Sequence, residues 1–366
     1  MNVDKTETLK ILRRLCEAHA PSGFEDEVRN ILIDELRSFV DSLEVDALGN
    51  LIAYKEGVGK DCPKILLCSH MDEVSLIVQY IDSEGFIHPE INGWIDASSL
   101  PAHTVIIHGR NGMVEGVVGA RSGHFKSLEE AKRVEIKDLW IDIGAESDVE
   151  VREMGVEVGD PITYKSGFTI LKDDRVASKS LDDRVGCTAL IQLMRMVSQN
   201  PIECSIYAVG SVQEEVGSRG IRTAAATINP DLALILDTVP AVDPSTETHE
   251  TTSKIGFGPV IRMMDTIWSS MLGTITPRIV RGLLIEASEE ENIKIQRDVM
   301  RTWTDATVHT VGKGIPSGSV LIPRRYAHSP TEICDLNDLM STVRLVYRAI
   351  SNIDKSFLSK IRFRIK

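Results

Sequence analysis

Five segments of the sequence place histidine or acidic side chains beside apolar runs of the kind that form buried strands, or at the start of a helix-type segment. The segments are Cys68-Ser-His-Met-Asp72, Ser180-Leu-Asp-Asp-Arg184, Val212-Gln-Glu-Glu-Val216, Leu234-Ile-Leu-Asp237 and Arg325-Tyr-Ala-His-Ser-Pro330. In open α/β sheets, functional sites form at the rim where strands end. We therefore expect these segments to meet at one sheet edge, although each of them alone is weak evidence for a site.

The first segment pairs an imidazole with a carboxylate. His70 closes an apolar run and Asp72 lies two residues further on, so both side chains project to the same side of an extended backbone. Asp72 can then accept the second imidazole N–H and fix the tautomer of His70 for a metal ion at the other nitrogen. The alternative is a structural role, which is the more common one for a lone histidine at a strand end.

Glu214 and Glu215 are adjacent carboxylates that directly follow another apolar run. Such a pair is repulsive unless a cation lies between the two groups or one of them is protonated. Because neighbouring side chains diverge, one can bind a metal ion while the other faces a metal-bound water. This division favours hydrolysis, in which a general base must lie within hydrogen-bond reach of the nucleophile.

The remaining segments offer further ligands. Asp182 and Asp183 precede a helix-type segment, where either can cap the helix, but a carboxylate can also bridge two cations. Asp237 ends an apolar strand and must be solvated, paired or ligated there, and His328 is held in a turn before a proline. Imidazole and carboxylate ligands without thiolate suit a pair of zinc, cobalt or manganese ions, and two such ions activate a bridging water.

The elements that must position these residues follow an α/β pattern. Helical spacing predicts helices over 4–19, 25–39, 183–196, 220–226, 274–287 and 335–350, and apolar runs predict strands over 43–45, 51–54, 64–70, 204–209, 232–236 and 320–322. This alternation predicts a mixed, largely parallel sheet with helices on both faces.

Between residues 74 and 170 the pattern changes to short β-type runs separated by glycine and proline turns, with a single helix expected over 127–132. Such spacing predicts a small β-barrel-like domain inserted into the chain. The sequence is therefore expected to form a discontinuous catalytic domain, residues 1–73 and 171–366, and an inserted β-rich domain, residues 74–170.

The composition excludes several classes of protein. The chain has 366 residues, a formal net charge of −13 and only 5% aromatic residues, so neither phosphate attraction nor base stacking favours nucleic acid as a partner. An apolar run of about 18 residues and a secretion signal are both absent from the sequence, which predicts a cytoplasmic protein without a membrane partner. The six cysteines form no C-x-x-C pair and are expected to be reduced thiols.

The same segments, in this order, resemble those of the glutamyl or deblocking aminopeptidases, which include the tetrahedral (TET) aminopeptidases. The resemblance spans almost the whole chain. Its motifs also include Ala20-Pro-Ser-Gly-Phe-Glu25, Asp46-Ala-Leu-Gly-Asn50, Gly93-Trp94 and Asn292-Ile-Lys-Ile-Gln296. It implies a zinc-peptidase-like fold and a metal-dependent aminopeptidase that releases N-terminal residues from short peptides.

The resemblance also assigns ligands. It implies that His70, Asp182 and Asp237 hold one divalent metal ion, and that Asp182, Glu215 and His328 hold a second, so that Asp182 bridges. Zinc or cobalt is implied, with manganese as an alternative.

Further roles come from the same source. Glu214 is implied as the general base that activates the water bridging the two ions. In similar enzymes the peptide bond after the bridging aspartate is cis, so a cis Asp182–Asp183 bond is expected. The inserted domain of similar proteins mediates assembly, often into dimers that build dodecamers, so a homo-oligomer is expected.

Two departures from the family pattern, Trp303 and Phe257, are expected to reshape the substrate pocket. Alternative functions are a two-metal hydrolase of another amide, such as an acylated amino acid or a carboxypeptidase substrate, an endoglucanase, and a non-catalytic paralogue. Intact ligand positions argue against the paralogue, and glycosidases normally use a metal-free carboxylate pair.

Overall fold

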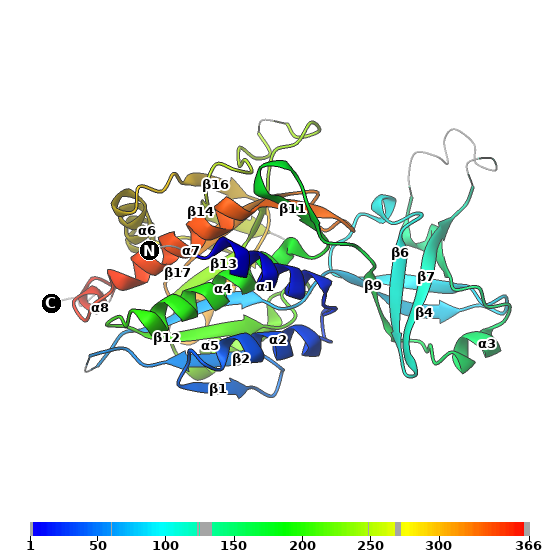
Figure 1. Ribbon diagram of the computed structural model, residues 1–366, viewed down its shortest axis with the longest axis horizontal. Coiled ribbons are helices and arrows are strands. Elements are labelled where there is room, and N and C mark those ends of the chain that lie inside the picture. Colours follow the sequence, from blue (N-terminus) through cyan, green and yellow to red (C-terminus); the bar gives the residue numbers. More distant parts are fainter. Residues whose placement is uncertain are drawn as a thin grey trace.

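The computed structural model describes residues 3–59, 61–122, 124, 134–247, 249–267 and 272–361. The chain forms a sheet domain, built on a twelve-stranded mixed sheet, and a smaller part in which six strands close into a barrel (Figure 1). The predicted α/β class with an inserted β-barrel is therefore confirmed.

Four parallel strands form the centre of the large sheet, in the order β12-β3-β13-β17. They are β3 (Lys64–His70), β12 (Ser205–Ser211), β13 (Leu232–Pro240) and β17 (Ser317–Arg325). All four are buried along most of their length because helices cover both faces of the sheet. Since these strands run parallel, their carboxyl ends lie at the same edge of the sheet.

Further strands extend the sheet on both sides of this centre, mostly in antiparallel pairs. The sequence predicted the first two of them, but not the remaining six, most of which are short or half-exposed. These strands are β1 (Ser42–Val45), β2 (Leu51–Lys55), β10 (Thr169–Ile170), β11 (Arg175–Ser178), β14 (Val260–Ile267), β15 (Leu272–Ile275), β16 (Gln296–Met300) and β18 (Glu332–Asp335).

Alternate residues of the central strands feed two cores. On β3, Ile65 and Leu67 belong to the core of one face, and Leu66 and Cys68 to that of the other. The second face is covered by α5 (Arg219–Ile228). The helices that contribute to the first core are α1 (Lys5–Glu17), α2 (Asp26–Leu36), α4 (Leu181–Gln199), α6 (Arg278–Glu290), α7 (Leu336–Ser351) and α8 (Phe357–Ile361).

The barrel has the strand order β4-β5-β8-β7-β6-β9 and is antiparallel throughout. Its strands are β4 (Ser75–Ile81), β5 (Ile87–Asn92), β6 (Thr104–Gly109), β7 (Gly112–Ala120), β8 (Leu139–Asp142) and β9 (Pro161–Tyr164). The helix expected over 127–132 lies outside the described residues.

The sequence missed one helix of the inserted segment, α3 (Asp148–Glu153). Ser147 caps it by accepting the N–H of Glu150 (3.3 Å), but Val151 is its only buried residue. Six residues with one buried position show no helical period, so the prediction of a single helix in this segment was wrong.

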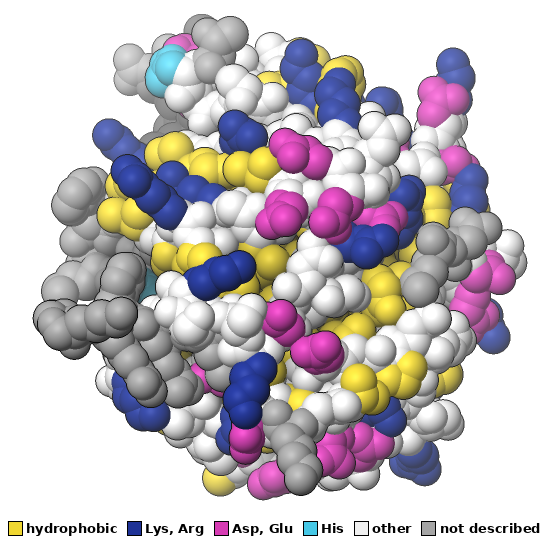
Figure 2. Space-filling model, turned by 90° about the vertical axis from the view of Figure 1, so that its left-hand side faces the viewer, with side chains coloured by type: hydrophobic (Ala, Val, Ile, Leu, Met, Phe, Trp, Pro, Cys, Tyr) yellow, Lys and Arg dark blue, Asp and Glu magenta, His cyan; other side chains and the backbone are white. Residues whose placement is uncertain are grey.

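Charges of both signs are interspersed over the end of the sheet domain that lies away from the barrel (Figure 2). Among the described residues, no helix combines the length and the apolar character that a bilayer span requires.

A buried charge cluster links the start of the barrel to the sheet domain. Glu73, which precedes β4, pairs with Lys179 Nζ (2.9 Å) and Arg184 Nη2 (3.2 Å), and all three side chains are at most 1% exposed. It also accepts the N–H of Ala20 (2.9 Å). Burial alone would raise the pKa of Glu73, but Lys179 and Arg184 lower this pKa to about 2. The ionised carboxylate is therefore part of the folded state at neutral pH.

Glu73→Gln is expected to lower the free energy of unfolding by about 3–5 kcal/mol at neutral pH, because it leaves two buried cations without their counter-charge. The folded-state pKa of about 2 lies below the ordinary value of 4.5, so the carboxylate stabilises the fold above about pH 4.5 and this contribution is lost as the pH falls toward 2. Urea unfolding at a series of pH values should show that the difference in free energy of unfolding between wild type and variant becomes smaller in acid. Glu44→Gln, at an exposed position of β1, is the control. A difference in free energy of unfolding that does not change with pH would contradict the stabilising role of the ionised Glu73.

Candidate active site

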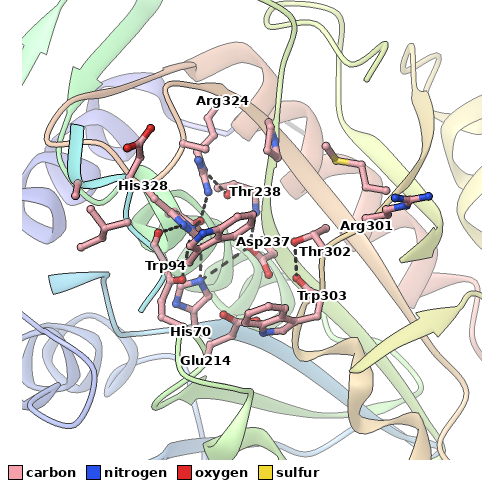
Figure 3. Close-up of a pocket in the computed structure, with 18 of the residues that line it drawn as sticks. His70, Trp94, Glu214, Asp237, Thr238, Arg301, Thr302, Trp303, Arg324 and His328 are labelled. Carbon is pink, nitrogen blue, oxygen red and sulfur yellow. Dashed lines mark hydrogen bonds and ion pairs between the residues drawn. The ribbon is translucent and has the colours of Figure 1, made fainter. Parts of the chain in front are cut away.

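A cavity of about 850 Å³ lies at the carboxyl edge of the central strands, between the sheet domain and the segment that follows β5 of the barrel. Figure 3 shows imidazole and carboxylate side chains from the ends of neighbouring strands gathered at this cavity. Its lining includes His70, Asp182, Glu214, Glu215, Asp237 and His328. The structure thus brings together side chains that are up to 258 residues apart in the sequence, from His70 to His328.

The candidate metal ligands form two groups that share one residue. In the first group, His70 Nε2 lies 3.1 Å from Asp182 Oδ1 and 3.9 Å from Asp237 Oδ1. In the second group, His328 Nε2 lies 3.2 Å from Asp182 Oδ2 and 3.4 Å from Glu215 Oε2. Each group offers three ligand atoms that lie within 4.8 Å of one another. Asp182 therefore presents one oxygen to each group, which is the arrangement that a bridging carboxylate requires.

Each imidazole is oriented by a second contact. Nδ1 of His70 lies 3.1 Å from the main-chain oxygen of Asp72 and 3.5 Å from its Oδ1, and Nδ1 of His328 lies 2.7 Å from the main-chain oxygen of Trp94. Acceptors at Nδ1 fix the proton there and leave Nε2 free to bind a cation. The predicted His70–Asp72 contact is present, with the main-chain oxygen of Asp72 nearer than its carboxylate.

Burial and mutual repulsion act strongly on the carboxylates of the site. Burial raises the pKa of Asp237 well above its usual range, and it raises that of Glu215 to about 7. Burial also raises the pKa of Asp182, but Arg324 and the two histidines outweigh it and hold this pKa well below the usual range. Burial lowers the pKa of His328, whereas Glu215 and Asp182 raise it, with a net value of about 9. A divalent cation would favour the ionised carboxylates and the neutral imidazoles that bind metal.

An oxygen atom of Glu215, unpartnered among the described residues, also indicates that these side chains can hold such a cation. Glu215 Oε1 is buried and has no hydrogen-bond partner within the described part of the chain. Unpartnered buried acceptors are costly, and a metal ion satisfies them. Two imidazoles and three carboxylates without thiolate suit zinc, cobalt or manganese.

Glu214 lines the cavity beside these ligands and is 5% exposed. Ser218 Oγ donates to its Oε1 (3.3 Å). Burial raises the pKa of Glu214 well above its ordinary range; the charge of His70 opposes this rise, while Asp305 and Asp237 add to it. A carboxyl group in this environment is suited to take up and hold a proton.

Asp72 supports the turn that carries both glutamates. Its Oδ1 accepts the N–H of Glu214 (2.9 Å), and its Oδ2 accepts the N–H of Glu215 (3.1 Å) and the hydroxyl of Ser22 (2.6 Å). The carboxylate is fully buried. The Asp72 carboxylate thus positions the predicted base Glu214 and the predicted ligands Glu215 and His70.

Asp72→Asn is expected to weaken metal binding by about 10- to 100-fold, because the amide nitrogen would face main-chain N–H donors in place of an acceptor. Competition between the protein and a chromophoric zinc chelator measures this affinity. Asp173→Asn, whose side chain is 70% exposed, is the matched control and should bind zinc as wild type does. Unchanged affinity in Asp72→Asn would show that the turn is held without this carboxylate.

The peptide bond between Asp182 and Asp183 is cis, which confirms the prediction. The two aspartates also divide the alternatives that the sequence left open. Asp183 Oδ1 accepts the N–H of Gly186 (3.0 Å) within the first turn of α4, as a capping residue does, and its Oδ2 accepts the hydroxyl of Ser69 (2.6 Å). Asp182 instead points to the two imidazoles.

Two residues of the site were not predicted from the sequence. Glu332 accepts the N–H of Asp182 at Oε2 (3.0 Å) and the N–H of His328 at Oε1 (2.8 Å), so it holds the main chains of two candidate ligands together. Arg324 pairs with the Asp182 carboxylate and lines the cavity. Neither residue carries a local sequence signal, because an isolated charged residue in or beside a strand is usually exposed.

The two departures from the family pattern have different surroundings. Trp303 lines the cavity, as expected, together with Arg301 and Thr302 (Figure 3). Phe257 is not among the residues that line the cavity; it is 44% exposed and lies against the ammonium group of Lys294. The expectation that Phe257 shapes the pocket was therefore wrong, since its ring packs on the surface.

A doubly covered α/β sheet with imidazole and carboxylate groups at its carboxyl edge, interrupted by a six-stranded barrel, defines a class of metal-dependent hydrolases. Residues 49–345 match the M42 glutamyl aminopeptidase family, and the chain belongs to this family. It is therefore a peptidase of the aminopeptidase type.

Individual relatives agree with this assignment. The lysyl aminopeptidase of Pyrococcus furiosus is 30% identical over 342 residues, which cover 92% of this chain and 94% of the relative. An aminopeptidase from Desulfurococcus kamchatkensis has a similar structure, with a TM-score of 0.93 and 32% identity over 99% of both chains. The TET peptidase of Pyrococcus horikoshii, which can assemble into a tetrahedron or a large octahedral shell, has a TM-score of 0.84 and 31% identity, and the match covers 96% of this chain and 100% of that one.

Proposed function

We propose that the protein removes N-terminal residues from short peptides with two divalent cations, zinc or cobalt and alternatively manganese. His70, Asp182 and Asp237 would hold one cation, and Asp182, Glu215 and His328 the other. The observation that carries this proposal is the position of Asp182, whose two oxygens lie 3.1 and 3.2 Å from the two imidazoles. Bound divalent cations would supply Lewis acidity toward the scissile carbonyl and lower the pKa of the attacking water toward about 7.

Glu214 is the general base in this proposal. It would take a proton from the attacking water and pass it to the amine of the leaving peptide. Its position on the cavity wall, beside but outside the two ligand groups, supports this role. Asp72 would keep Glu214 in place through the main-chain N–H.

The charge of the cavity favours a free amino terminus. Acidic side chains that belong to neither ligand group, and so keep their charge when cations are bound, line the same cavity: Asp96, Glu135 and Glu214. Such a concentration of carboxylates attracts a protonated amine and gives no equivalent contact to an acylated one. This supports an exopeptidase that acts at the N-terminus over an enzyme that acts on acylated amino acids.

The barrel is the part that we assign to assembly. The proposed division places residues 1–73 and 171–366 in the catalytic domain and residues 74–170 in the insert, and the six barrel strands fall within the latter range. The tetrahedral and octahedral assemblies of the TET peptidase from Pyrococcus horikoshii support a homo-oligomer, and we propose a size between a dimer and a dodecamer for this chain. Light scattering coupled to size exclusion would test this.

A panel of substrates tests the function. Protein stripped with a chelator and reloaded with zinc, cobalt or manganese should cleave aminoacyl-anilides with a free amino group. The same anilides with an acetylated amino group, carboxypeptidase substrates and cellulosic substrates should not be cleaved. Faster cleavage of acetylated substrates, or hydrolysis of glycosides, would overturn the proposal.

A further inference from the structure

Arg324 introduces a fixed positive charge at the shared carboxylate. The residue is the penultimate one of β17, is 3% exposed, and its guanidinium lines the cavity (Figure 3). It makes three contacts: Nη2 pairs with Asp182 Oδ2, Nε donates to Thr238 Oγ1 (2.7 Å), and Nη1 lies 3.1 Å from Glu332 Oε1. The guanidinium is thus held against Asp182 from two other directions.

The contact is not symmetric between the two ligand groups. Arg324 pairs with Oδ2 of Asp182, the oxygen that also faces His328 Nε2 (3.2 Å) in the second group. The other oxygen, Oδ1, faces His70 (3.1 Å) in the first group. A cation that enters the second group must therefore share Oδ2 with a guanidinium or displace it, whereas a cation in the first group uses the opposite oxygen.

The two groups also differ in shielding. The side chain of His70 is 2% exposed and that of His328 is 21% exposed. Burial strengthens the attraction between a cation and its carboxylates, so the first group is favoured on this ground as well.

We propose that Arg324 is a built-in competitor for the cation of the second group, so that this group binds its ion more weakly and exchanges it more readily than the first. The inference rests on the proposed function only in that both groups bind a divalent cation. The reason is electrostatic: two positive charges beside one carboxylate oxygen repel each other, and each reduces the affinity of the oxygen for the other.

Titration of chelator-stripped protein with Co²⁺ alone tests this, with calorimetry for affinity and the visible absorption of cobalt to distinguish the two sites. Wild type should bind two ions in two resolved steps. Arg324→Met keeps the length of the side chain without its charge, and it should tighten the weaker step by about tenfold or more, the size of effect that neighbours of metal ligands commonly have. The affinity of the tighter step should change by less than about threefold, because the first group does not use Oδ2 of Asp182, the oxygen that pairs with Arg324.

The adjacent residue provides the matched control. The Nε of Arg325 donates to the main-chain oxygen of Val242 (3.0 Å), so Arg325→Met should leave both steps unchanged. If Arg324→Met does not fold, Arg324→Lys serves, because a point charge cannot keep the forked contacts to Asp182 and Thr238 together, and the weaker step should tighten by a smaller factor.

Two results would overturn the inference: equal affinities for both ions in wild type, or a weaker step that is unchanged or further weakened in Arg324→Met. Neither result bears on peptide cleavage, because no peptide is present in the titration. Conversely, if the enzyme with both cations bound fails to cleave aminoacyl-anilides, the proposed function is wrong. The measured affinities of the two cation sites, and the inference about Arg324, are not affected by that result.

Discussion

Replacement of Glu214 by glutamine is expected to lower kcat for aminoacyl-anilide hydrolysis by about 10²- to 10⁴-fold, the usual contribution of a positioned general base. The amide has nearly the same size as the carboxyl group but cannot accept a proton from water at neutral pH. The loss should therefore fall on kcat, and KM should change little, since Glu214 belongs to neither ligand group.

The surroundings of Glu214 make this substitution a clean test. Within the part of the chain that the structure describes, the side chain has one hydrogen bond, from Ser218 Oγ to Oε1 (3.3 Å), and glutamine can accept that bond at its amide oxygen. The N–H that donates to Asp72 belongs to the main chain and is kept. Folding and metal content should therefore match wild type, and both are checked by thermal unfolding and by elemental analysis.

Glu247→Gln, with a side chain that is 73% exposed, is the control and should retain full turnover. Glu215→Gln is the informative comparison, because it should lose metal as well as activity. Turnover at the wild-type level in Glu214→Gln would remove Glu214 as the base. Loss of activity together with loss of metal would instead make it a ligand.

Asp182→Asn should have an equally large effect by a different route. Asp182 is the one residue present in both ligand groups, so loss of its charge weakens both at once. We expect the protein to retain less than one ion per chain after dialysis, and we expect activity to fall by more than about 10²-fold, because removal of one preorganised charge contact commonly costs 10²–10³. Chelation of the wild-type enzyme should give the same loss, and added zinc or cobalt should reverse it.

His328→Ala distinguishes a shared ligand from a ligand of one group. It removes a ligand from the second group and leaves His70, Asp182 and Asp237 intact, so one ion should remain bound. Elemental analysis of both variants after the same dialysis gives the comparison. Equal metal content in Asp182→Asn and His328→Ala would contradict a bridging role for Asp182.

The sequence by itself determined most of the fold, because the main elements are long and periodic. The strand of residues 64–70 and the helix of residues 335–350 each show their period without help from the rest of the chain, and both are present in the structure. Elements that depend on partners were missed. Strand β14 gains its stability from pairing with β15, β16 and β17, and β16 gains its stability from pairing with β14, and a single sequence does not show such pairing.

Local chemistry and resemblance to a family together named His70, Asp72, Asp182, Glu214, Glu215, Asp237 and His328. The structure gathers six of these residues at one cavity and buries Asp72 beneath the turn that carries Glu214 and Glu215. What only the tertiary structure decided is how the groups face one another. Which oxygen of Asp182 meets which imidazole, and which of them pairs with Arg324, depends on side chains 112 to 146 residues apart in sequence. The physical reason is that direction and distance fix electrostatic contacts, and these arise only where the parallel strands end side by side.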